Sequence, residues 1–391
     1  MNAERSLAHI ETIAEVQPIP EKDRIVLAKV LGWNVVIGKD EFAVGDKVVF
    51  VEVDSRLNTA FGPFSALAKD ADKHGFVHIK TRKFGGSYSQ GICFRVPERY
   101  GRLKEGSDLT EKFNKGKEGK NLAIVHNEEY KSLKEEWNSP PKKSFAVRMW
   151  KRILHRLFPG KKRGGERNCV PDPYSAGVRK TDEERIQNLV ELFERLRAEG
   201  TVLTATEKLD GQSFTAHMDQ NGKIYVASRN VPLYFAHSDK EKRYGTYEGS
   251  NWQKVYEKYD LGKVLDLIRK ELFVSAVTIQ GEIIGTGIQG NPYGFTGEEK
   301  RLMVFNVIAD GKRLPYTEMK AVCAGCGLET VPLIGSVALD SATTIEKFIE
   351  MSDGVSAVNA AAMREGIVYR TEDYRLSFKA VSNRYLMKRG E

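Results

Sequence analysis

The chain has 391 residues, a formal net charge of +8 and a pI near 9.0. This length exceeds the usual range of one domain, so we expect two domains, each with its own core. The modest basic surplus favours a polyanionic partner and excludes a polycation dominated by a basic tail.

The sequence shows no sign of secretion or membrane insertion. Its four cysteines suggest no disulfide framework, and the first residues lack a charged-then-apolar leader. No apolar run approaches the roughly 20 residues that cross a bilayer. We therefore expect a cytoplasmic monomer, in the host cytoplasm if the chain is viral, without integral membrane association.

Residues 1–112 predict a β-rich module. Its strand-like runs are separated by turns rich in Gly, Pro and Asp. They cover Ser6–Ile13, Ile25–Ile37, Lys47–Val53 and Val77–Arg82. At most one helical stretch interrupts them, near Phe64–Asp72. The pattern favours a small barrel of the OB type, although other small barrels or sandwiches fit it as well.

Residues 113–175 predict a charged linker between the two domains, with Pro140 and Pro141 adjoining. From Val147 to Phe158, apolar residues fall on one half of a helix and basic residues on the other. Such a helix could bind RNA phosphates or an anionic membrane surface. We favour a helix docked on a domain with its basic face in water.

Residues 176–391 predict an α+β domain. Thr181 is expected to cap a helix that carries Ile186, Leu189 and Leu196. Strands are expected at Val202–Thr206, Ser213–Met218, Ile224–Ser228, Ala276–Ile284, Leu302–Ile308, Ile367–Tyr369 and Leu376–Ala380. Helices are expected at Trp252–Tyr259, Gly262–Glu271, Tyr316–Cys326 and Thr344–Ser352.

The motif Lys208-Leu209-Asp210-Gly211 follows the first of these strands. A lysine amine attacks a nucleotide phosphate only if its neighbours disfavour its protonated form, because its ordinary pKa is about 10.4. Asp210, Glu282 and Glu365 could hold a divalent metal that does this, and Lys379 could lower the same pKa. Alone, the motif could also be a surface turn between two strands.

Six motifs occur in one order along the chain: Lys208-Leu209-Asp210-Gly211, Ser228-Arg229-Asn230, Gly281-Glu282, Val304-Phe305-Asn306-Val307, Glu365-Gly366-Ile367-Val368 and Ser377-Phe378-Lys379. With them the sequence resembles the polynucleotide ligases and capping enzymes, which form a lysyl-nucleotide intermediate. It looks most like the ATP-dependent RNA ligases that carry an OB module ahead of the ligase domain. The resemblance covers nearly the whole chain, including residues 179–188 and 86–91.

The resemblance implies a role for each motif. Lys208 would be the adenylated nucleophile, and Lys379 would hold the α-phosphate of ATP. Phe305 would stack on adenine. Arg229 would contact the ribose or the incoming phosphate, and Glu207 would belong to the same nucleotide site.

The resemblance also implies a metal site, in which Asp210, Glu282 and Glu365 would bind Mg²⁺ or Mn²⁺ through its water shell and contact the ribose hydroxyls. One departure concerns Ser377, since related ligases often have a lysine there. Arg375 could supply the missing cation.

The sequence therefore predicts an ATP-dependent RNA ligase. Lys208 would form lysyl-AMP, AMP would pass to a 5′-phosphate end, and a 3′-hydroxyl would then displace AMP. The partner would be RNA, as a nicked duplex or a broken structured RNA. The OB module would grip it through residues that could equally form an ordinary solvated strand: Lys80, Arg82, Lys83, Phe84 and Tyr88.

Three alternatives stay open. A DNA ligase or a capping guanylyltransferase usually places its OB domain after the last motif, whereas here 391 − 379 = 12 residues follow Lys379. A nucleic-acid-binding protein that has lost catalysis would be expected to have changed Lys208, Glu282 or Lys379, and all three are present.

Overall fold

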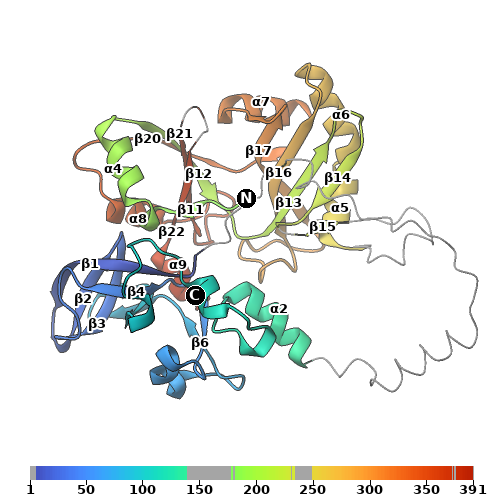
Figure 1. Ribbon diagram of the computed structural model, residues 1–391. Coiled ribbons are helices and arrows are strands. Elements are labelled where there is room, and N and C mark those ends of the chain that lie inside the picture. The colour runs from blue at the N-terminus through green and yellow to red at the C-terminus, as the bar shows by residue number, and fades with distance from the viewer. Residues whose placement is uncertain are drawn as a thin grey trace, which may run out of the picture.

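The computed structural model describes residues 6–138, 178, 181–229, 231–233, 249–371, 373 and 376–390. The predicted basic helix over residues 147–158 lies outside these ranges, and so does Arg375. Figure 1 shows an amino-terminal module packed beneath a larger carboxy-terminal domain, in which two separate sheets stand side by side. The predicted α+β class is confirmed.

The amino-terminal module consists of antiparallel sheets. One has the strand order β3-β2-β1-β4-β9 and another the order β10-β5-β6, while β7 and β8 form a hairpin. The bounds are β1 Ala8–Ile19, β2 Lys22–Val30, β3 Trp33–Gly38, β4 Lys47–Val51, β5 Ser55–Asn58, β6 Phe76–Ile79, β7 Arg82–Phe84, β8 Ser87–Ser89 and β9 Ile92–Arg95.

Strand β4 shows why this module curls around two cores. Its side chains alternate between the two faces of the sheet, and both faces are buried. Val49 and Val51 pack in one apolar cluster, whereas Val48 and Phe50 pack in the other. The predicted helical stretch is a 3₁₀ helix, Gly62–Asp70, which contributes Phe64 to the first cluster.

The predicted run Ile25–Ile37 is two strands, because a turn at Leu31 and Gly32 separates β2 from β3. Leu31 has a φ of 51°, and a Cβ on Gly32 would lie 2.9 Å from the Gln187 Cα. The second domain therefore approaches the turn too closely for a side chain at residue 32. The run contains no Pro or Asp to mark this turn.

The amino-terminal module continues past the predicted boundary at residue 112. Helix α1, Thr110–Asn114, is followed by β10, Ile124–His126, which pairs with β5. Helix α2, Asn127–Asn138, then packs its Tyr130 against Phe76 of β6. The first part of the predicted linker is thus folded, because its apolar residues complete the core of the module.

The carboxy-terminal domain contains two main sheets. The five-stranded sheet has the order β11-β22-β21-β12-β20, and the seven-stranded sheet the order β15-β14-β13-β16-β17-β18, with β19 beside β17. The bounds are β11 Glu184–Arg185, β12 Val202–Lys208, β13 Gln212–Met218, β14 Ile224–Ala227, β15 Pro232–Leu233, β16 Val277–Gly285, β17 Lys300–Ala309, β18 Lys312–Arg313, β19 Glu329–Thr330, β20 Leu333–Ala338, β21 Gly366–Thr371 and β22 Ser377–Val381. Each of the seven predicted strands is present.

Helices cover the outer faces of these sheets. The predicted helices correspond to α5 Asn251–Lys258, α6 Leu261–Glu271, α7 Tyr316–Gly325 and α8 Ile345–Ser352. Apolar residues of α5, α6 and α7 share a core with the seven-stranded sheet, and those of α4, Val190–Ala198, and α8 share another with the five-stranded sheet. A helix not predicted, α9 Asn383–Arg389, ends the described chain.

The prediction that Thr181 caps a helix is wrong. Residues Glu184–Arg185 form strand β11, a single 3₁₀ turn follows at Ile186–Asn188, and α4 begins only at Val190. The Thr181 hydroxyl instead lies 3.2 Å from that of Ser213. Pairing of β11 with β22 outweighs the local capping signal.

Among the described helices, none combines the length and the apolar character that a membrane span requires.

Candidate active site

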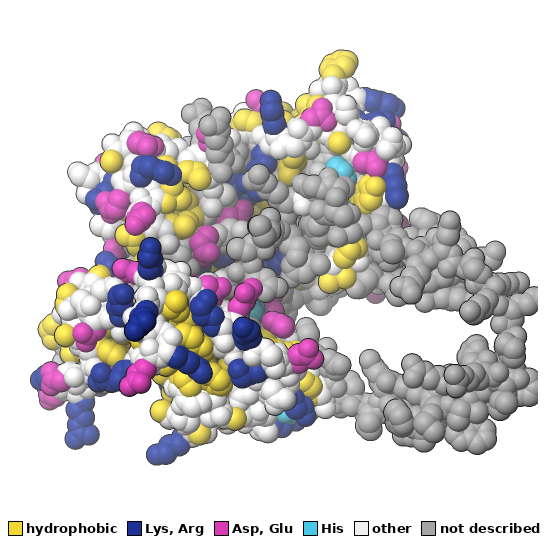
Figure 2. Space-filling model, in the orientation of Figure 1, with side chains coloured by type: hydrophobic (Ala, Val, Ile, Leu, Met, Phe, Trp, Pro, Cys, Tyr) yellow, Lys and Arg dark blue, Asp and Glu magenta, His cyan; other side chains and the backbone are white. Residues whose placement is uncertain are grey.

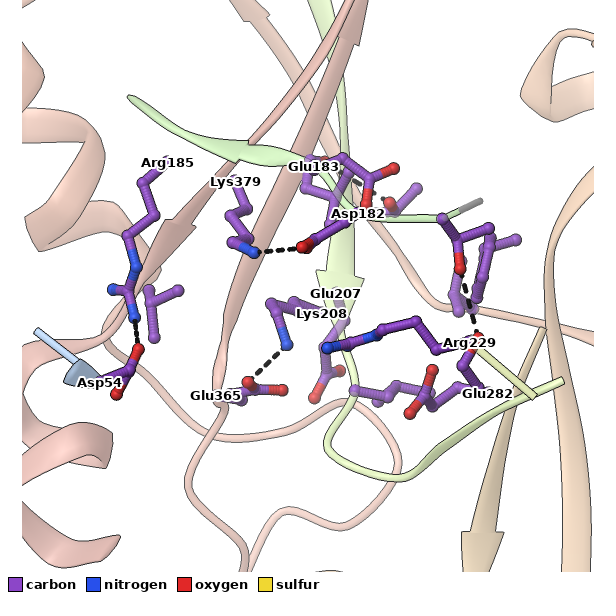
Figure 3. A pocket seen from close by; sticks show the side chains of 18 of the residues that line it. Asp54, Asp182, Glu183, Arg185, Glu207, Lys208, Arg229, Glu282, Glu365 and Lys379 are labelled. Atoms are coloured by element: carbon purple, nitrogen blue, oxygen red, sulfur yellow. Dashed lines mark hydrogen bonds and ion pairs between the residues drawn. The ribbon is translucent and has the colours of Figure 1, made fainter. Parts of the chain in front are cut away.

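A pocket opens where the two sheets of the carboxy-terminal domain face each other and the amino-terminal module meets them. The structure brings seven of the eight predicted site residues to this pocket: Glu207, Lys208, Arg229, Glu282, Phe305, Glu365 and Lys379. Asp210 is the exception. Figure 3 shows the charged side chains converging from strands that are far apart in sequence.

One face of the five-stranded sheet forms part of the pocket wall. The strand registers place Thr206 opposite Val368, Val368 opposite Lys379, and Lys379 beside Arg185. All four residues line the pocket. Cross-strand neighbours share one face of a sheet, so the pairing of β11 with β22 sets two cations side by side.

Lys208 is the last residue of β12, at the point where the chain leaves the five-stranded sheet. Its Nζ donates a hydrogen bond to Glu365 Oε1, and the two form an ion pair. Burial alone lowers the pKa of Lys208, but Glu365, Glu282 and Asp210 outweigh burial and raise it.

The expectation that Lys379 lowers the pKa of Lys208 stays a prediction, because in the protein alone the neighbouring carboxylates raise this pKa overall. Lys379 Nζ pairs with Asp182 Oδ1 at 2.9 Å. The negative charge beside Lys208 comes from carboxylates that the sequence analysis had assigned to a metal.

The turn after Lys208 crosses to the seven-stranded sheet and touches it closely. A Cβ on Gly211 would lie 2.3 Å from the backbone oxygen of Ile283 and 2.8 Å from Glu282 Cγ. Only glycine fits there, which explains the last position of the motif. Burial raises the pKa of Glu282 to about 8, against the opposing effect of Lys208 and Arg229.

Asp210 belongs to this turn but is not among the residues that line the pocket. Its Oδ2 accepts a hydrogen bond from the Tyr385 hydroxyl at 2.6 Å and lies 3.4 Å from Arg389 Nη2. Its backbone N–H donates to the Tyr293 hydroxyl at 2.8 Å. Burial and the charge of Glu365 raise the pKa of Asp210.

Arg229 reaches the pocket from the end of β14 and is contacted from the amino-terminal module. Its Nη1 lies 3.6 Å from Glu128 Oε2 of α2. Burial lowers the pKa of Arg229, but Asp182, Glu128 and further carboxylates outweigh burial and raise it. Figure 3 shows Arg229 extending between Lys208 and Glu282.

Several charged residues of this pocket were not predicted from the sequence. Arg185 Nη2 donates to Asp54 Oδ2 at 2.7 Å, and Asp182 pairs with Lys379. Both Asp182 and Arg185 belong to the stretch 179–188, which the family resemblance singled out without assigning a role. Glu128 carries no sequence signal, because the packing of α2 alone brings it to the pocket.

Ser377, where related ligases often carry a lysine, donates a hydrogen bond to Glu183 Oε1 at 3.1 Å. The same oxygen accepts one from Arg370 Nη2 at 3.1 Å. Although burial opposes it, Arg370 holds the pKa of Glu183 below its ordinary value. Arg370 lines the pocket, so a cation lies near Ser377 on the neighbouring strand.

The carboxylates of the pocket fit a divalent metal such as Mg²⁺ or Mn²⁺. Glu365 Oε2 and Glu207 Oε1 are buried oxygens that find no hydrogen-bond partner among the described residues, and such hard oxygen donors suit these ions. Within the described ranges, no three His, Cys, Asp or Glu residues form a metal cage. One or two carboxylates, with phosphate and water oxygens, are the usual Mg²⁺ ligands.

The predicted RNA-contacting residues of the amino-terminal module lie on its surface. Arg82 and Lys83 of β7 and Lys80 before it are exposed. Lys83 Nζ lies 5.2 Å from the centre of the Tyr88 ring across the β7–β8 hairpin.

Together, the fold and the pocket define a class of protein. A lysine amine stands at the junction of two sheets, surrounded by cations that suit phosphates and carboxylates that suit a metal. This is the arrangement of a covalent nucleotidyltransferase.

Comparison with known proteins agrees with this class. Residues 201–388 match the RNA ligase family, and residues 7–96 match a family described as an OB-fold domain. No curated protein matches the chain.

Similar solved structures include three of an RNA ligase from Naegleria gruberi, each 26% identical to this chain. An apo variant covers 98% of both chains with a TM-score of 0.73. The ligase with pyrophosphate covers 98% of this chain and 99% of its own, with a TM-score of 0.74. A variant with ATP and Mn covers 98% of both, with a TM-score of 0.72. The chain is thus an RNA ligase with an amino-terminal OB-fold domain, as its motifs predicted.

Proposed function

We propose that this RNA ligase uses ATP to seal 3′-hydroxyl and 5′-phosphate RNA ends through lysyl-AMP and AMP-RNA intermediates. The observation that carries the proposal is the position of Lys208 Nζ in the pocket, hydrogen-bonded to Glu365 and facing Glu282 and Arg229. The Naegleria gruberi ligase, which has been solved with ATP and Mn, supports the choice of nucleotide and metal.

In the first step, Lys208 Nζ loses a proton and attacks the α-phosphorus of ATP. A P–N bond forms, the bond from the α-phosphorus to the bridging oxygen breaks, and pyrophosphate leaves. Glu365 Oε1 already accepts a hydrogen bond from Nζ, so it is the nearest acceptor for the proton. Lys379 and Arg229 neutralise the charge that develops on the phosphate.

Phe305 of β17 lines the pocket. Its aromatic ring would stack on the adenine. A bound Mg²⁺ or Mn²⁺ would screen the phosphate charge and disfavour the protonated lysine. Glu282 and Glu365 would hold it, directly or through water, and Asp210 would support them from the turn after Lys208.

In the second step, an oxygen of the RNA 5′-phosphate attacks the AMP phosphorus, the P–N bond breaks, and Lys208 regains a proton. In the third, the RNA 3′-hydroxyl oxygen attacks the 5′-phosphate, loses its proton and displaces AMP. The exposed Lys80, Arg82 and Lys83 would contact the RNA backbone. Figure 2 shows further Lys and Arg side chains spread over the same module.

We propose RNA as the substrate in the form of a nicked duplex or a broken structured RNA, bound by a monomer in the cytoplasm. The order of the two domains supports RNA ligation over DNA ligation or capping.

The test is incubation of the protein with α-³²P-labelled ATP or GTP and Mg²⁺ or Mn²⁺, followed by a denaturing gel. We expect covalent label from ATP on the wild type and none on Lys208→Ala. Nicked RNA and nicked DNA duplexes then define the substrate, and RNA should be sealed faster. Label from GTP alone would indicate capping chemistry, and no label from either nucleotide on the folded protein would indicate a non-catalytic binding protein.

A further inference from the structure

The carboxy-terminal helix α9 contacts the two segments that flank Lys208. At its start, Ser382 N donates to the backbone oxygen of Glu365 at 2.9 Å. The Ser382 hydroxyl caps the helix by accepting from Tyr385 N at 3.0 Å. From the same first turn, the Tyr385 hydroxyl donates to Asp210 Oδ2 at 2.6 Å. One short helix therefore links Asp210 to Glu365 across the nucleophile.

The last residues of α9 also contact the turn after Lys208. Arg389 Nη2 lies 3.4 Å from Asp210 Oδ2, and its Nη1 donates to the backbone oxygen of Gln289 at 2.9 Å. Gln289 Nε2 in turn donates to the backbone oxygen of Gly211 at 3.3 Å. The turn after Lys208 is thus held by α9 and by the loop that follows β16.

Tyr385 contributes to this network without facing the substrate. Its side chain is buried at 5% exposure, and it does not line the pocket. A hydrogen bond to a charged carboxylate is stronger than a neutral one. Asp210 is therefore the hydrogen-bonded residue that connects the Tyr385 hydroxyl to the turn after Lys208.

We propose that Tyr385 is a positioning residue for lysyl-AMP formation, and that Arg389 supports it. The two side chains hold the carboxylate of Asp210, so that the turn behind Lys208 presents Nζ in one orientation toward the α-phosphate. This inference rests on the proposed function and adds to it a role for the helix that follows the last motif.

The test measures lysyl-AMP formation in single turnover by the full-length protein, as a function of ATP concentration, for the wild type and Tyr385→Phe. Loss of a hydrogen bond to a charged group corresponds to a rate loss of about tenfold at saturating ATP. We expect this loss with an ATP concentration at half-maximal rate unchanged within about twofold, because no contact with ATP is removed. Equal rates for both proteins would overturn the inference.

Tyr225→Phe is the matched control. The Tyr225 hydroxyl donates to Asp219 Oδ2 at 3.0 Å, away from the pocket, so this variant loses the same kind of hydrogen bond. We expect it to form lysyl-AMP at the wild-type rate. A slowing equal to that of Tyr385→Phe would overturn the inference, because the loss would then be a general effect of stability.

A double-mutant cycle with Asp210→Asn tests the route of the effect. If Tyr385 acts through Asp210, the two losses are not additive, and Tyr385→Phe costs less than about twofold in the Asp210→Asn background. Additive losses would overturn the inference. If Tyr385→Phe fails to fold, Arg389→Met carries the same comparison, because that side chain is 30% exposed. If the wild type takes up no label, the proposed function is wrong, and the inference about Tyr385 is overturned with it. This result is distinct from equal labelling of the wild type and Tyr385→Phe, which overturns the inference alone.

Discussion

The Arg185 guanidinium donates a hydrogen bond to Asp54 at 2.7 Å. This bond joins β11, an edge strand of the five-stranded sheet, to the OB-fold module. The side chains of Arg185 and Asp54 are only 5% and 15% exposed. Trp33 of the module donates to Asn188 Oδ1 at 2.5 Å beside this pair. The two domains therefore meet through buried polar contacts that border the pocket.

We predict that Asp54→Ala strongly destabilises the protein, because Arg185 loses a buried partner. Removal of one member of a buried ion pair costs about 3–5 kcal/mol. The measurement is the free energy of unfolding from urea titration. Glu346→Ala is the control, because its inter-domain pair with Lys29 is 34% to 41% exposed and should cost at most about 1 kcal/mol. Equal losses for the two variants would contradict the prediction.

Stability should fall as the pH rises from about 6.5 to about 9. Burial alone lowers the pKa of His9, but hydrogen bonds to Glu11 and Glu52 outweigh burial and raise it to about 9. A group whose pKa is higher in the folded than in the unfolded state stabilises the fold fully at a pH below its unfolded pKa, which is near 6.5 for histidine. This stabilisation is lost as the pH rises through the folded-state pKa. Thermal unfolding measured across this pH range checks the prediction. The His9→Gln variant should not show the decline in stability.

His78 provides the opposite control in the same module. Burial and Arg56 lower its pKa to about 4, so its contribution is lost as the pH falls from about 6.5 to about 4. His78→Gln should therefore leave the alkaline decline in place. A flat alkaline profile in the wild type would show that His9 does not titrate as described.

Gly211→Ala should impair lysyl-AMP formation by displacing the turn after Lys208. The added Cβ would lie 2.3 Å from the Ile283 oxygen, and such overpacking costs about 1–3 kcal/mol. Gly62→Ala is the control, since no atom of the part of the chain that the structure describes lies within 4 Å of its Cβ position. Wild-type rates in both variants would mean that the backbone approach at Gly211 has no functional consequence.

Phe305→Leu should weaken ATP binding, whereas Phe305→Tyr should preserve it. Base stacking on an aromatic ring contributes about 1–3 kcal/mol, so the KM for ATP should rise about tenfold when the ring is removed. The rate at saturating ATP should change less. An unchanged KM in the leucine variant would place the adenine away from Phe305.

Local patterns in the sequence predicted most of the catalytic domain. The strands that carry Lys208, Glu282, Phe305 and Lys379 have strong apolar periodicity, and their motifs gathered at one pocket. Short segments that depend on long-range pairing were not predictable. The clearest case is β11, which carries Arg185 and consists of two residues held by β22.

The ion-pair partners inside the pocket could not be predicted from the sequence either. Glu128 comes from α2, which sequence composition had assigned to a linker. Asp182 is almost two hundred positions from Lys379 along the chain, and only the folded sheet brings them to 2.9 Å. The carboxylate of Asp210 is contacted by Tyr385 and Arg389 of α9, a helix that was not predicted from the sequence.

Strand β11 has one further consequence, for how such enzymes can be divided or recombined. The chain that enters the catalytic domain is also an edge of the active-site sheet, and it supplies Asp182 to Lys379 and Arg185 to the pocket. A fragment that begins at residue 201, where the ligase family match starts, would lack both. An exchange of OB-fold modules between ligases would preserve the pocket only if residues 181–189 stayed joined to the carboxy-terminal domain.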